Sequence, residues 1–593
     1  MPAKFAIGID LGTTNSVLGF VPLDDPEATV SVLPVPQVTA PGNVESRSTL
    51  PSFLFLSESP DASGAFRVPW DEKPRDFVAG ALARDQSSDQ PLRTVASAKS
   101  WLCHSRVDRR AAILPWQSPE EVAKISPVEA SSRCLCHLAA AWNHAHPDAP
   151  LAKQRVALTV PASFDASARE LTREAALQAG LPKDLILLEE PQAAVYAWLA
   201  DHGQSWRRQL KTGDVLLVCD VGGGTSDFTL ISVASEDGDL ALQRLAVGNH
   251  ILVGGDNMDA ALAFAAQELF AAQGVAVDAW QSVALWHACR AAKEQLLGPE
   301  APSEVPVTIQ GRGRKLVGGT ISAKLTGEKV NAVLLDGFFP QCAAGDSPQA
   351  NRSSGFRELG LPFEQDVAVT RHLARFLRSN ARGGSESATA THVLFNGGVF
   401  KSPVLRARVT EVLRGWGMPA AELAPQADLD CAVARGAAYY AAAKSSGGVR
   451  IRGGTARSYY VGIESAGLAV PGAPRPLRAL CVVPFGMEEG TELDVPGAEF
   501  ELITGEPATF RFFSAAARKD DRPGILLDRW PPDELVETDS LQAELPAPEG
   551  TEPGHVPVRF LSRITELGQL ELWCKAVNSD SQWKLEFRVR EDA

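Results

Sequence analysis

The most constraining feature of the sequence is residues 215–231, VLLVCDVGGGTSDFTLI, in which an apolar run ends at an aspartate and three glycines. The apolar half predicts a buried strand, and the half after the glycines alternates as a second strand does. Three successive glycines let the backbone approach a bulky anion and direct N–H groups at it. Residues 215–231 therefore predict either a phosphate-binding turn beside the Asp220 carboxylate or a plain glycine hairpin.

Residues 4–20, KFAIGIDLGTTNSVLGF, repeat this design near the N-terminus. An apolar strand again ends at an aspartate, Asp10, and a turn rich in glycine and hydroxyl groups follows. The recurrence disfavours two ordinary hairpins and predicts two facing phosphate loops. Carboxylates beside such loops suit Mg²⁺, which keeps several waters and is held by few carboxylates together with substrate phosphates. The two stretches together point to a nucleoside triphosphate.

The chain between the two hairpins follows a strand, helix, strand order that is typical of an α/β protein. Residues 154–161 predict a buried strand ended by a proline, and Asp165 caps a helix that stops before Gly180. The next strand ends at Glu190, where a carboxylate can hold an attacking or metal-bound water. Lys99, further upstream, could reach a γ-phosphate, although its spacing alone favours an exposed lysine.

Three later stretches offer contacts to the rest of a nucleotide. A helix follows one glycine pair, and its N-terminus can bind phosphate. A second helix, over residues 283–297, carries charged residues that fit either a nucleoside-facing surface or a solvated face. Another glycine pair, in FNGGVFKSP, would let a flat ring lie against the backbone. These candidates are Gly254, Gly255, Asp256, Arg290, Lys293, Glu294, Gly397 and Gly398.

Composition and charge narrow the classes of partner. With 57 Lys and Arg against 72 Asp and Glu, the formal net charge is -15, which argues against nucleic acid and anionic membranes. The N-terminus lacks a long apolar segment with a cleavage site, and no later run approaches the roughly 20 apolar residues of a membrane span. We therefore expect a cytoplasmic protein. Cys134 and Cys136, followed by His137, fit buried apolar residues better than a metal site.

The sequence pattern changes after the small-residue helix that begins near Asp430. Residues 446–456 are rich in glycine and basic side chains and predict a linker. Residues 457–593 show strand-type alternation, as in TFRFF and QLELWCKAV, and predict an antiparallel β domain. We therefore divide the chain into three parts, residues 1–445, 446–456 and 457–593.

Seven motifs, in their order and spacing, resemble the nucleotide-binding domain of the seventy-kilodalton heat-shock chaperones. They are IDLGTTNS, LTVPASFDASAR, LEEPQAA, CDVGGGTSD, VGGDNMD, FNGGVFKSP and DLDCAVARGAA, and the resemblance covers about residues 4–443. It implies an α/β fold with an actin-like, two-lobed ATPase domain that binds ATP or ADP and Mg²⁺, with K⁺ as a further candidate cation. The β domain is distantly similar to the family's peptide-binding β-sandwich. Because the sequence stops after WKLEFRVRE, we expect no helical lid.

The resemblance assigns roles to the residues that match the family's motifs. Asp10 and Asp220 would hold Mg²⁺ through water. The attacking water and the γ-phosphate would be positioned by Lys99, Glu190, Asp220 and Thr225. The two phosphate loops would consist of Gly12, Thr13, Thr14 and Asn15, and of Gly222, Gly223, Gly224 and Thr225, with Asp227 beside the second. The other nucleotide contacts would come from Gly254, Gly255, Asp256, Arg290, Lys293, Glu294, Gly397, Gly398, Lys401 and Asp430.

Two departures from the family's pattern bear on function. On the helix over residues 283–297 the family usually presents Glu, Lys, Arg and Ser to the nucleoside, whereas the matching positions here hold Arg290, Lys293, Glu294 and Leu297. A buried polar group that loses its partner weakens binding. We therefore expect altered affinity and base selectivity. The linker is basic and glycine-rich, whereas the family's linker is acidic and leucine-rich.

The favoured hypothesis is a slow ATPase of the chaperone type, in which the nucleotide state controls the binding of an unfolded or extended polypeptide. Pro161 and Arg169 match the family's residues that relay the nucleotide state between domains. The implied partners are a J-domain co-chaperone and a nucleotide-exchange factor, and we expect a monomer. The alternative is an ATP-switched scaffold or regulator with one dedicated protein partner. A small-molecule kinase of the same fold is disfavoured, because no acceptor-binding residues are recognisable.

Overall fold

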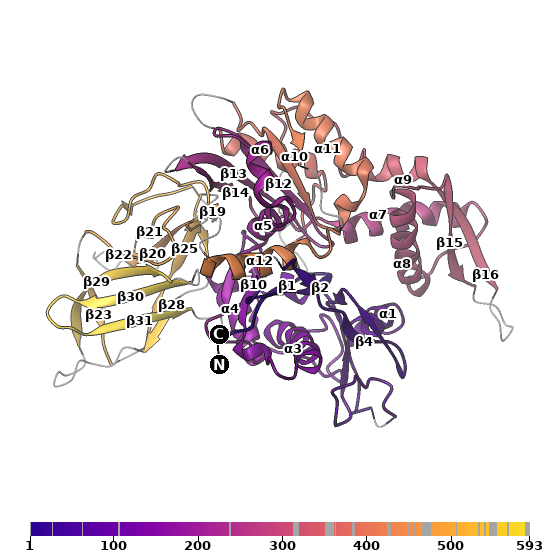
Figure 1. Ribbon diagram of the computed structural model, residues 1–593, viewed down its shortest axis with the longest axis horizontal. Helices are drawn as coiled ribbons and strands as arrows, with labels where there is room; N and C mark the ends of the chain where they lie inside the picture. The colour runs from indigo at the N-terminus through magenta and orange to yellow at the C-terminus, as the bar shows by residue number, and fades with distance from the viewer. Residues whose placement is uncertain are drawn as a thin grey trace.

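The protein is described by a computed structural model, in which mixed α/β sheets are followed by a region of antiparallel sheets (Figure 1). The mixed α/β class expected from the sequence is confirmed. Among the described residues no helix has the length and apolar character needed to cross a membrane. The structure describes residues 2–25, 28–61, 63–104, 107–236, 239–311, 319–349, 361, 363–381, 386–423, 428–446, 451–452, 454–455, 457–464, 476–497, 499–505, 507–531, 534–538, 541–544, 554–565 and 569–587.

The first mixed sheet is built on the N-terminal hairpin. Its first strand pairs antiparallel with the second strand and parallel with β10 on its other side. These strands read as apolar runs because both faces of the sheet are covered. In sheet order the strands are β11 (Ile186–Glu189), β10 (Arg155–Val160), β1 (Phe5–Leu11), β2 (Asn15–Pro22) and β3 (Ser31–Val32), with β6 (Leu50–Pro51) also paired to β2.

The second mixed sheet repeats the plan of the first. Its central hairpin contains the glycine-rich stretch, and the first strand of that hairpin again has a parallel neighbour, β17. The two aspartates singled out in the sequence therefore occupy matching places, each at the end of a strand flanked by one parallel and one antiparallel neighbour. In sheet order the strands are β18 (Ala421–Glu422), β17 (His392–Asn396), β12 (Val215–Val221), β13 (Ser226–Glu236), β14 (Asp239–Val247) and β19 (Ile451–Arg452).

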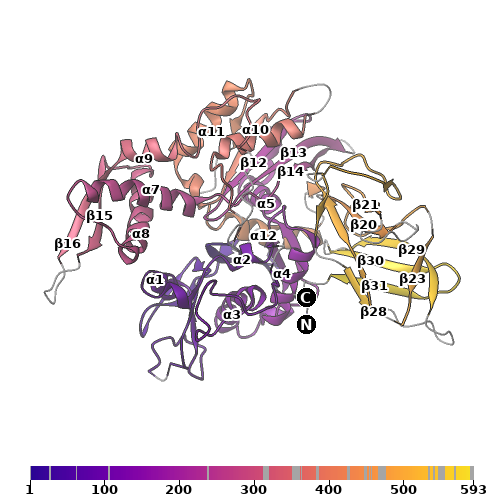
Figure 2. The ribbon, with the colours of Figure 1, turned by 180° about the vertical axis from the view of Figure 1, so that it is seen from behind.

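Two helices, α5 (Glu190–His202) and α12 (Ala432–Ser446), lie between the two mixed sheets (Figures 1 and 2). They approach each other closely, because a Cβ on Gly436 would collide with the carbonyl of Ala193. Gly8 plays the same part where β1 meets α12. Glycine at these two positions lets the two sheets share one helical layer.

The outer helices and small sheets surround this centre. Beside the first mixed sheet lie α1 (Ala81–Asp89), α2 (Ala98–Trp101), α3 (Pro127–Ala145), α4 (Ala166–Gln178), the β4 (Val35–Ala40) and β5 (Asn43–Arg47) pair, and the sheet of β7 (Leu54–Leu56), β8 (Phe77–Ala79) and β9 (Thr94–Val95). Beside the second lie α6 (Trp206–Gln209), α7 (Gly255–Ala271), α8 (Ala279–Leu296), α9 (Gly327–Leu334), α10 (Val369–Ser379), α11 (Pro403–Gly415), and the β15 (Glu304–Gln310) and β16 (Thr320–Thr326) hairpin.

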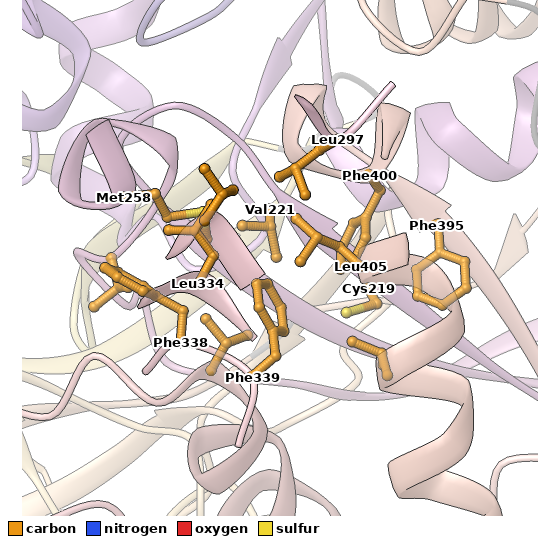
Figure 3. Packing of buried hydrophobic residues seen from close by; sticks show 14 of the residues in the cluster. Cys219, Val221, Met258, Leu297, Leu334, Phe338, Phe339, Phe395, Phe400 and Leu405 are labelled. Carbon is orange, nitrogen blue, oxygen red and sulfur yellow. The ribbon is translucent and has the colours of Figure 1, made fainter. Parts of the chain in front are cut away.

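One large hydrophobic cluster supports the second hairpin from behind. Figure 3 shows Cys219 and Val221 of β12 packed among side chains from α7, α9, β17 and α11. Close packing of this kind resists displacement, so it holds the end of β12 in a defined position. The other labelled residues are Met258, Leu297, Leu334, Phe338, Phe339, Phe395, Phe400 and Leu405.

The C-terminal region consists of two antiparallel sheets whose inner faces share one hydrophobic cluster. The sheet of five contains β26 (Leu526–Leu527), β21 (Leu477–Val483), β20 (Ser458–Glu464), β25 (Phe512–Ala515) and β27 (Val536–Glu537). The sheet of seven contains β22 (Thr491–Asp494), β23 (Phe500–Ile503), β29 (His555–Ile564), β30 (Leu570–Ala576), β31 (Gln582–Phe587), β28 (Leu541–Glu544) and β24 (Pro507–Phe510). The last residues of the expected final strand, 588–591, lie outside the described residues.

The segment predicted as a linker is partly ordered against the second mixed sheet. Ser446 still belongs to α12, and Ile451 and Arg452 form β19, which pairs parallel with β14. Residues 447–450, 453 and 456 of the predicted linker lie outside the described residues. The C-terminal region is docked as well, because Ala166 of α4 packs into its hydrophobic cluster.

Candidate functional site

The two glycine-rich turns face each other at contact distance. A Cβ on Gly223 would collide with the Thr14 hydroxyl, and one on Gly224 would lie 3.0 Å from the Thr13 methyl carbon. The first turn is braced by Ser52, whose hydroxyl donates to the Gly12 carbonyl oxygen at 2.8 Å. The two turns therefore form one cradle that depends on the absence of side chains at the glycines.

The cradle opens into a cavity of about 530 Å³. Every site residue expected from the sequence lines this cavity except Gly224 and Gly254. Gly254 instead packs on the second turn, where a Cβ would lie 2.5 Å from the Gly223 carbonyl oxygen. Residues brought together from distant parts of the chain include Lys99 of α2, Glu190 of α5 and Asp430, which lies two residues before α12.

The N-terminus of α7 is tied directly to the second turn. The Gly255 amide donates to the Gly222 carbonyl oxygen at 2.9 Å, and the Asp256 amide donates to that of Gly223 at 2.7 Å. These two N–H groups are therefore already committed to the protein. The helix places the Asp256 side chain at the cavity wall.

Carboxylates crowd the centre of the cavity around a single lysine. Lys99 forms an ion pair with Glu190, and both side chains are largely buried. Burial raises the pKa of Glu190 to about 7, and burial together with the neighbouring Glu190 raises the pKa of Asp220 to about 8. Burial also raises the pKa of Asp10, against the opposing effect of Lys99. Such a cluster is short of positive charge.

The arrangement fits a hydrated Mg²⁺ ion bound together with phosphates. Among the described residues no three His, Cys, Asp or Glu side chains converge as direct metal ligands. Mg²⁺ does not require such a cage, because it keeps most of its waters and takes few protein carboxylates. The buried Thr14 hydroxyl and the side-chain amide oxygen of Asn396 also lack hydrogen-bond partners, as expected of groups that face a polar ligand.

Two residues that sequence reasoning missed orient the paired aspartates. The Thr159 hydroxyl donates to Asp10 at 3.0 Å, and the Asn396 amide donates to Asp220 at 2.7 Å. Each is the register partner of its aspartate on the parallel neighbouring strand. A polar residue at the end of an apolar strand, in LTVP and in FNGG, was the signal that could have identified them.

The charged residues of α8 form a network at the end of the cavity that the sequence motifs predict to face the nucleoside. Arg290 pairs with Asp256 and, at 2.6 Å, with Asp259, while Lys293 approaches Asp259 at 2.7 Å. Asp259 is fully buried, and sequence reasoning missed it. Burial raises the pKa of Asp256 to about 6 despite the nearby arginine. Both α8 cations are thus neutralised by carboxylates from α7.

Another part of the cavity wall contains Gly397, whose φ of 86° lies in the region that favours glycine. A Cβ there would crowd the Asp220 carboxylate at 2.6 Å. Lys401 pairs with Asp430 close by. Glu294 also lines the cavity, with an exposed side chain. This end of the cavity therefore combines bare backbone with two groups of opposite charge, Glu294 and Lys401.

Comparison with known proteins gives a consistent result. The family model described as Hsp70 protein matches residues 68–337. A Chaperone protein HscA homolog of Histophilus somni (strain 2336) is 32% identical over 279 residues, which is 44% of this chain and 37% of that protein. The HscA homolog of Bordetella pertussis is 31% identical over 317 residues, covering 51% and 43%. The matches thus span less than half the length of these relatives. Over residues 68–337 the chain is thus similar to the Hsp70 family, which agrees with the paired turns and the cavity between them.

Proposed function

We propose that this protein binds and hydrolyses ATP and uses its nucleotide state to control binding of an unfolded or extended polypeptide. The observation that carries the proposal is the pair of facing phosphate turns around the buried Lys99–Glu190 ion pair. Similarity to the Hsp70 family over residues 68–337 supports a chaperone-type ATPase. In this proposal residues 1–445 are an actin-like, two-lobed ATPase domain, residues 446–456 a linker, and residues 457–593 a β-sandwich domain.

The phosphate end of the cavity would carry the chemistry. Amides and hydroxyls of the two turns would bind the phosphates of ATP or ADP, and Thr225 would orient the γ-phosphate. Asp10 and Asp220 would hold a hydrated Mg²⁺ ion, which supplies positive charge to the phosphate oxygens. Thr159 and Asn396 would keep these two carboxylates oriented, through the hydrogen bonds described above.

Lys99 and Glu190 would act on the γ-phosphate and on the attacking water. Burial lowers the pKa of Lys99, but the carboxylates of Glu190 and Asp10 outweigh it, so Lys99 stays a cation. A buried cation aimed at the γ-phosphate stabilises negative charge that develops there. Glu190 would accept a hydrogen bond from the attacking water. Burial raises the pKa of Glu190 to about 7, and Lys99 opposes that rise and so favours the ionised form that this role requires.

A buried ionic network would join the cleft to the C-terminal region. Glu189, next to Glu190, accepts from Arg169 at 2.8 Å and pairs with Arg244. Arg244 also donates to the carbonyl of Gly454, beside β19. Since Glu189 and Glu190 are neighbours, displacement of β19 would disturb the start of α5. This network supports the proposed control of the β region by the nucleotide.

ATP turnover tests the first part of the proposal. Purified protein should release phosphate from Mg-ATP slowly, and Lys99→Ala should nearly abolish the release. Arg559→Ala is the matched control for loss of a cation, because Arg559 is an exposed arginine of β29 that pairs with Glu499. Absence of phosphate release from the wild type, with purity and folding verified, would contradict the proposed reaction.

A panel of unfolded peptides tests the second part. Nucleotide-dependent binding of many unrelated sequences is the expected result, because recognition of extended backbone tolerates many side chains. Binding of none of the peptides, with one folded protein retained in pull-downs, would contradict the chaperone proposal and favour a scaffold with a dedicated partner. Addition of a J-domain protein or a nucleotide-exchange factor to the turnover assay would test those two partners.

A further inference from the structure

A polar cluster that the proposed chemistry does not use lies beside the cleft wall. Ser163 sits in the turn between β10 and α4, and its side chain is buried. Its hydroxyl lies 2.8 Å from Asp227 Oδ1 and 3.0 Å from His250 Nδ1. The direct distance from His250 Nδ1 to Asp227 Oδ1 is longer, at 3.4 Å. Ser163 therefore bridges the two charged groups.

The charge of His250 determines which group donates in each hydrogen bond of this bridge. Burial lowers the pKa of His250, but Asp227 and Cys103 together more than compensate, so the net pKa lies well above its usual value. The imidazolium Nδ1–H then donates to the Ser163 oxygen, and the single hydroxyl proton of Ser163 donates to Asp227. A hydrogen bond to an ionised acceptor is stronger than a neutral one. Ser163 thus orients Asp227, which lines the cavity.

The other side of Ser163 faces the C-terminal region. Arg457, directly before β20, donates to the carbonyl oxygen of Ser163 at 3.3 Å. Three residues further along the chain, Ala166 packs in the hydrophobic cluster of the two antiparallel sheets. The turn that contains Ser163 is therefore held at one end by the cleft and at the other by the docked C-terminal region.

We propose that Ser163 is a positioning residue that orients Asp227 for nucleotide turnover only while Arg457 is docked on its carbonyl oxygen. Arg457 would keep the turn in the conformation that points the hydroxyl at Asp227. Undocking would free the turn, and Asp227 would lose its hydroxyl donor. This inference rests on the proposed ATP hydrolysis, and it names two residues, Ser163 and Arg457, through which the β region would act on the cleft.

A double-mutant cycle on turnover tests the inference. Ser163→Ala should lower kcat by about tenfold, the loss expected for a hydrogen bond to a charged group, with little change in KM. Ser163→Thr keeps the hydroxyl and should retain kcat within about twofold. Arg457→Ala should also lower kcat, and the double variant should be no slower than Ser163→Ala, because both changes remove one effect. The control is Arg559→Ala, as above.

Three results would overturn the inference: wild-type kcat in Ser163→Ala, failure of threonine to replace serine, or a double variant slowed by the product of the two single effects. A second readout separates this inference from the proposed reaction. The NMR shifts of the His250 ring should change in Arg457→Ala as they do in Ser163→Ala, whether or not ATP is hydrolysed. Unchanged His250 shifts in Arg457→Ala, with the melting temperature preserved, would contradict the relay even in a protein without ATPase activity.

Discussion

Lys99 and Glu190 are ninety-one residues apart in the chain, yet they form a buried ion pair in the wall of the cavity. One residue belongs to the four-residue helix α2 and the other begins α5. The two elements lie on different sides of the first mixed sheet, so the pair forms only when that part of the protein is folded. The pair defines the point where the proposed chemistry would take place.

Loss of the lysine should remove catalysis without removing the fold. We expect Lys99→Ala to lower kcat at least about 100-fold, because a buried cation aimed at the γ-phosphate stabilises charge in the transition state. Phosphate release under saturating Mg-ATP is the measurement. Lys324→Ala, at an exposed lysine paired with Glu304 on the β15–β16 hairpin, is the control. Equal turnover in Lys99→Ala and the wild type would refute the assigned role.

A methyl group on the second turn should separate the two phosphate turns. In Gly223→Ala the added Cβ would collide with Thr14, and relief of such overpacking costs roughly 1–3 kcal/mol. We expect the affinity for Mg-ATP to fall at least about tenfold, measured by fluorescence of a labelled nucleotide. Gly415→Ala is the control, since a Cβ at Gly415 would meet open space. Undiminished affinity in Gly223→Ala would show that the turns do not clamp a phosphate.

The pH dependence of stability should reveal His137 of α3. This histidine is 3% exposed, donates to the Pro36 carbonyl oxygen at 2.8 Å, and has its pKa lowered by burial to about 4. Between pH 6.5 and 4 this imidazole binds a proton in the unfolded protein but not in the folded protein. The free energy of unfolding therefore decreases as the pH falls through this window, by roughly 3 kcal/mol from this group.

The measurement is urea unfolding of the nucleotide-free protein at pH 6.5 and pH 4.5, for the wild type and His137→Gln. The variant lacks the titrating group, so its stability should fall less over this interval. Cys134, on the same helix, is buried as expected. The expectation that Cys136 is buried is wrong, because Cys136 lies on the exposed face of α3. Parallel losses in the two proteins would show that His137 is not held neutral in the fold.

Removal of Arg244 should loosen β19, the short strand that pairs with β14. Its side chain is 1% exposed and pairs with Glu189, so Arg244→Ala leaves a buried carboxylate with Arg169 as its remaining cation in the described network. Breaking a buried pair costs about 3 kcal/mol, which should speed amide exchange in β19 more than tenfold. Hydrogen exchange by mass spectrometry is the readout, with the exposed Arg208→Ala of α6 as control. Unchanged protection of β19 would contradict this coupling.

Local patterns predicted the two aspartates beside the glycine turns, while the residues around them depended on the fold. Asp10 and Asp220 could be predicted because each ends an apolar strand before a glycine turn. Thr159 and Asn396 could not, because their contacts follow from parallel register between strands far apart in sequence. The helix cap at Asp165 was also local, and its side chain accepts from the Ala168 amide as expected.

The predicted nucleoside end of the cavity and the predicted linker show the limit of such patterns. The sequence placed Arg290 on a helix that fitted either a nucleoside-facing or a solvated face, and only packing of α7 on α8 shows that its charge is taken up by Asp256 and Asp259. The segment KSSGGVRIRGGT resembled a flexible linker. Its pairing as β19 depends on β14, which lies more than two hundred residues earlier, so local composition carried no signal for it.

Calorimetric titration of Mg-ATP into the wild type and into Asp220→Asn tests the central claim most directly. Asn would preserve the volume of Asp220 and its place beside Asn396, but it removes the charge proposed to hold the hydrated Mg²⁺. We expect saturable binding at one site in the wild type, with ATP and ADP compared against GTP to test the altered nucleoside end, and affinity for Mg-ATP in the variant at least about tenfold weaker. Absence of ATP binding to the wild type, or equal Mg-ATP affinity in Asp220→Asn, would contradict the account.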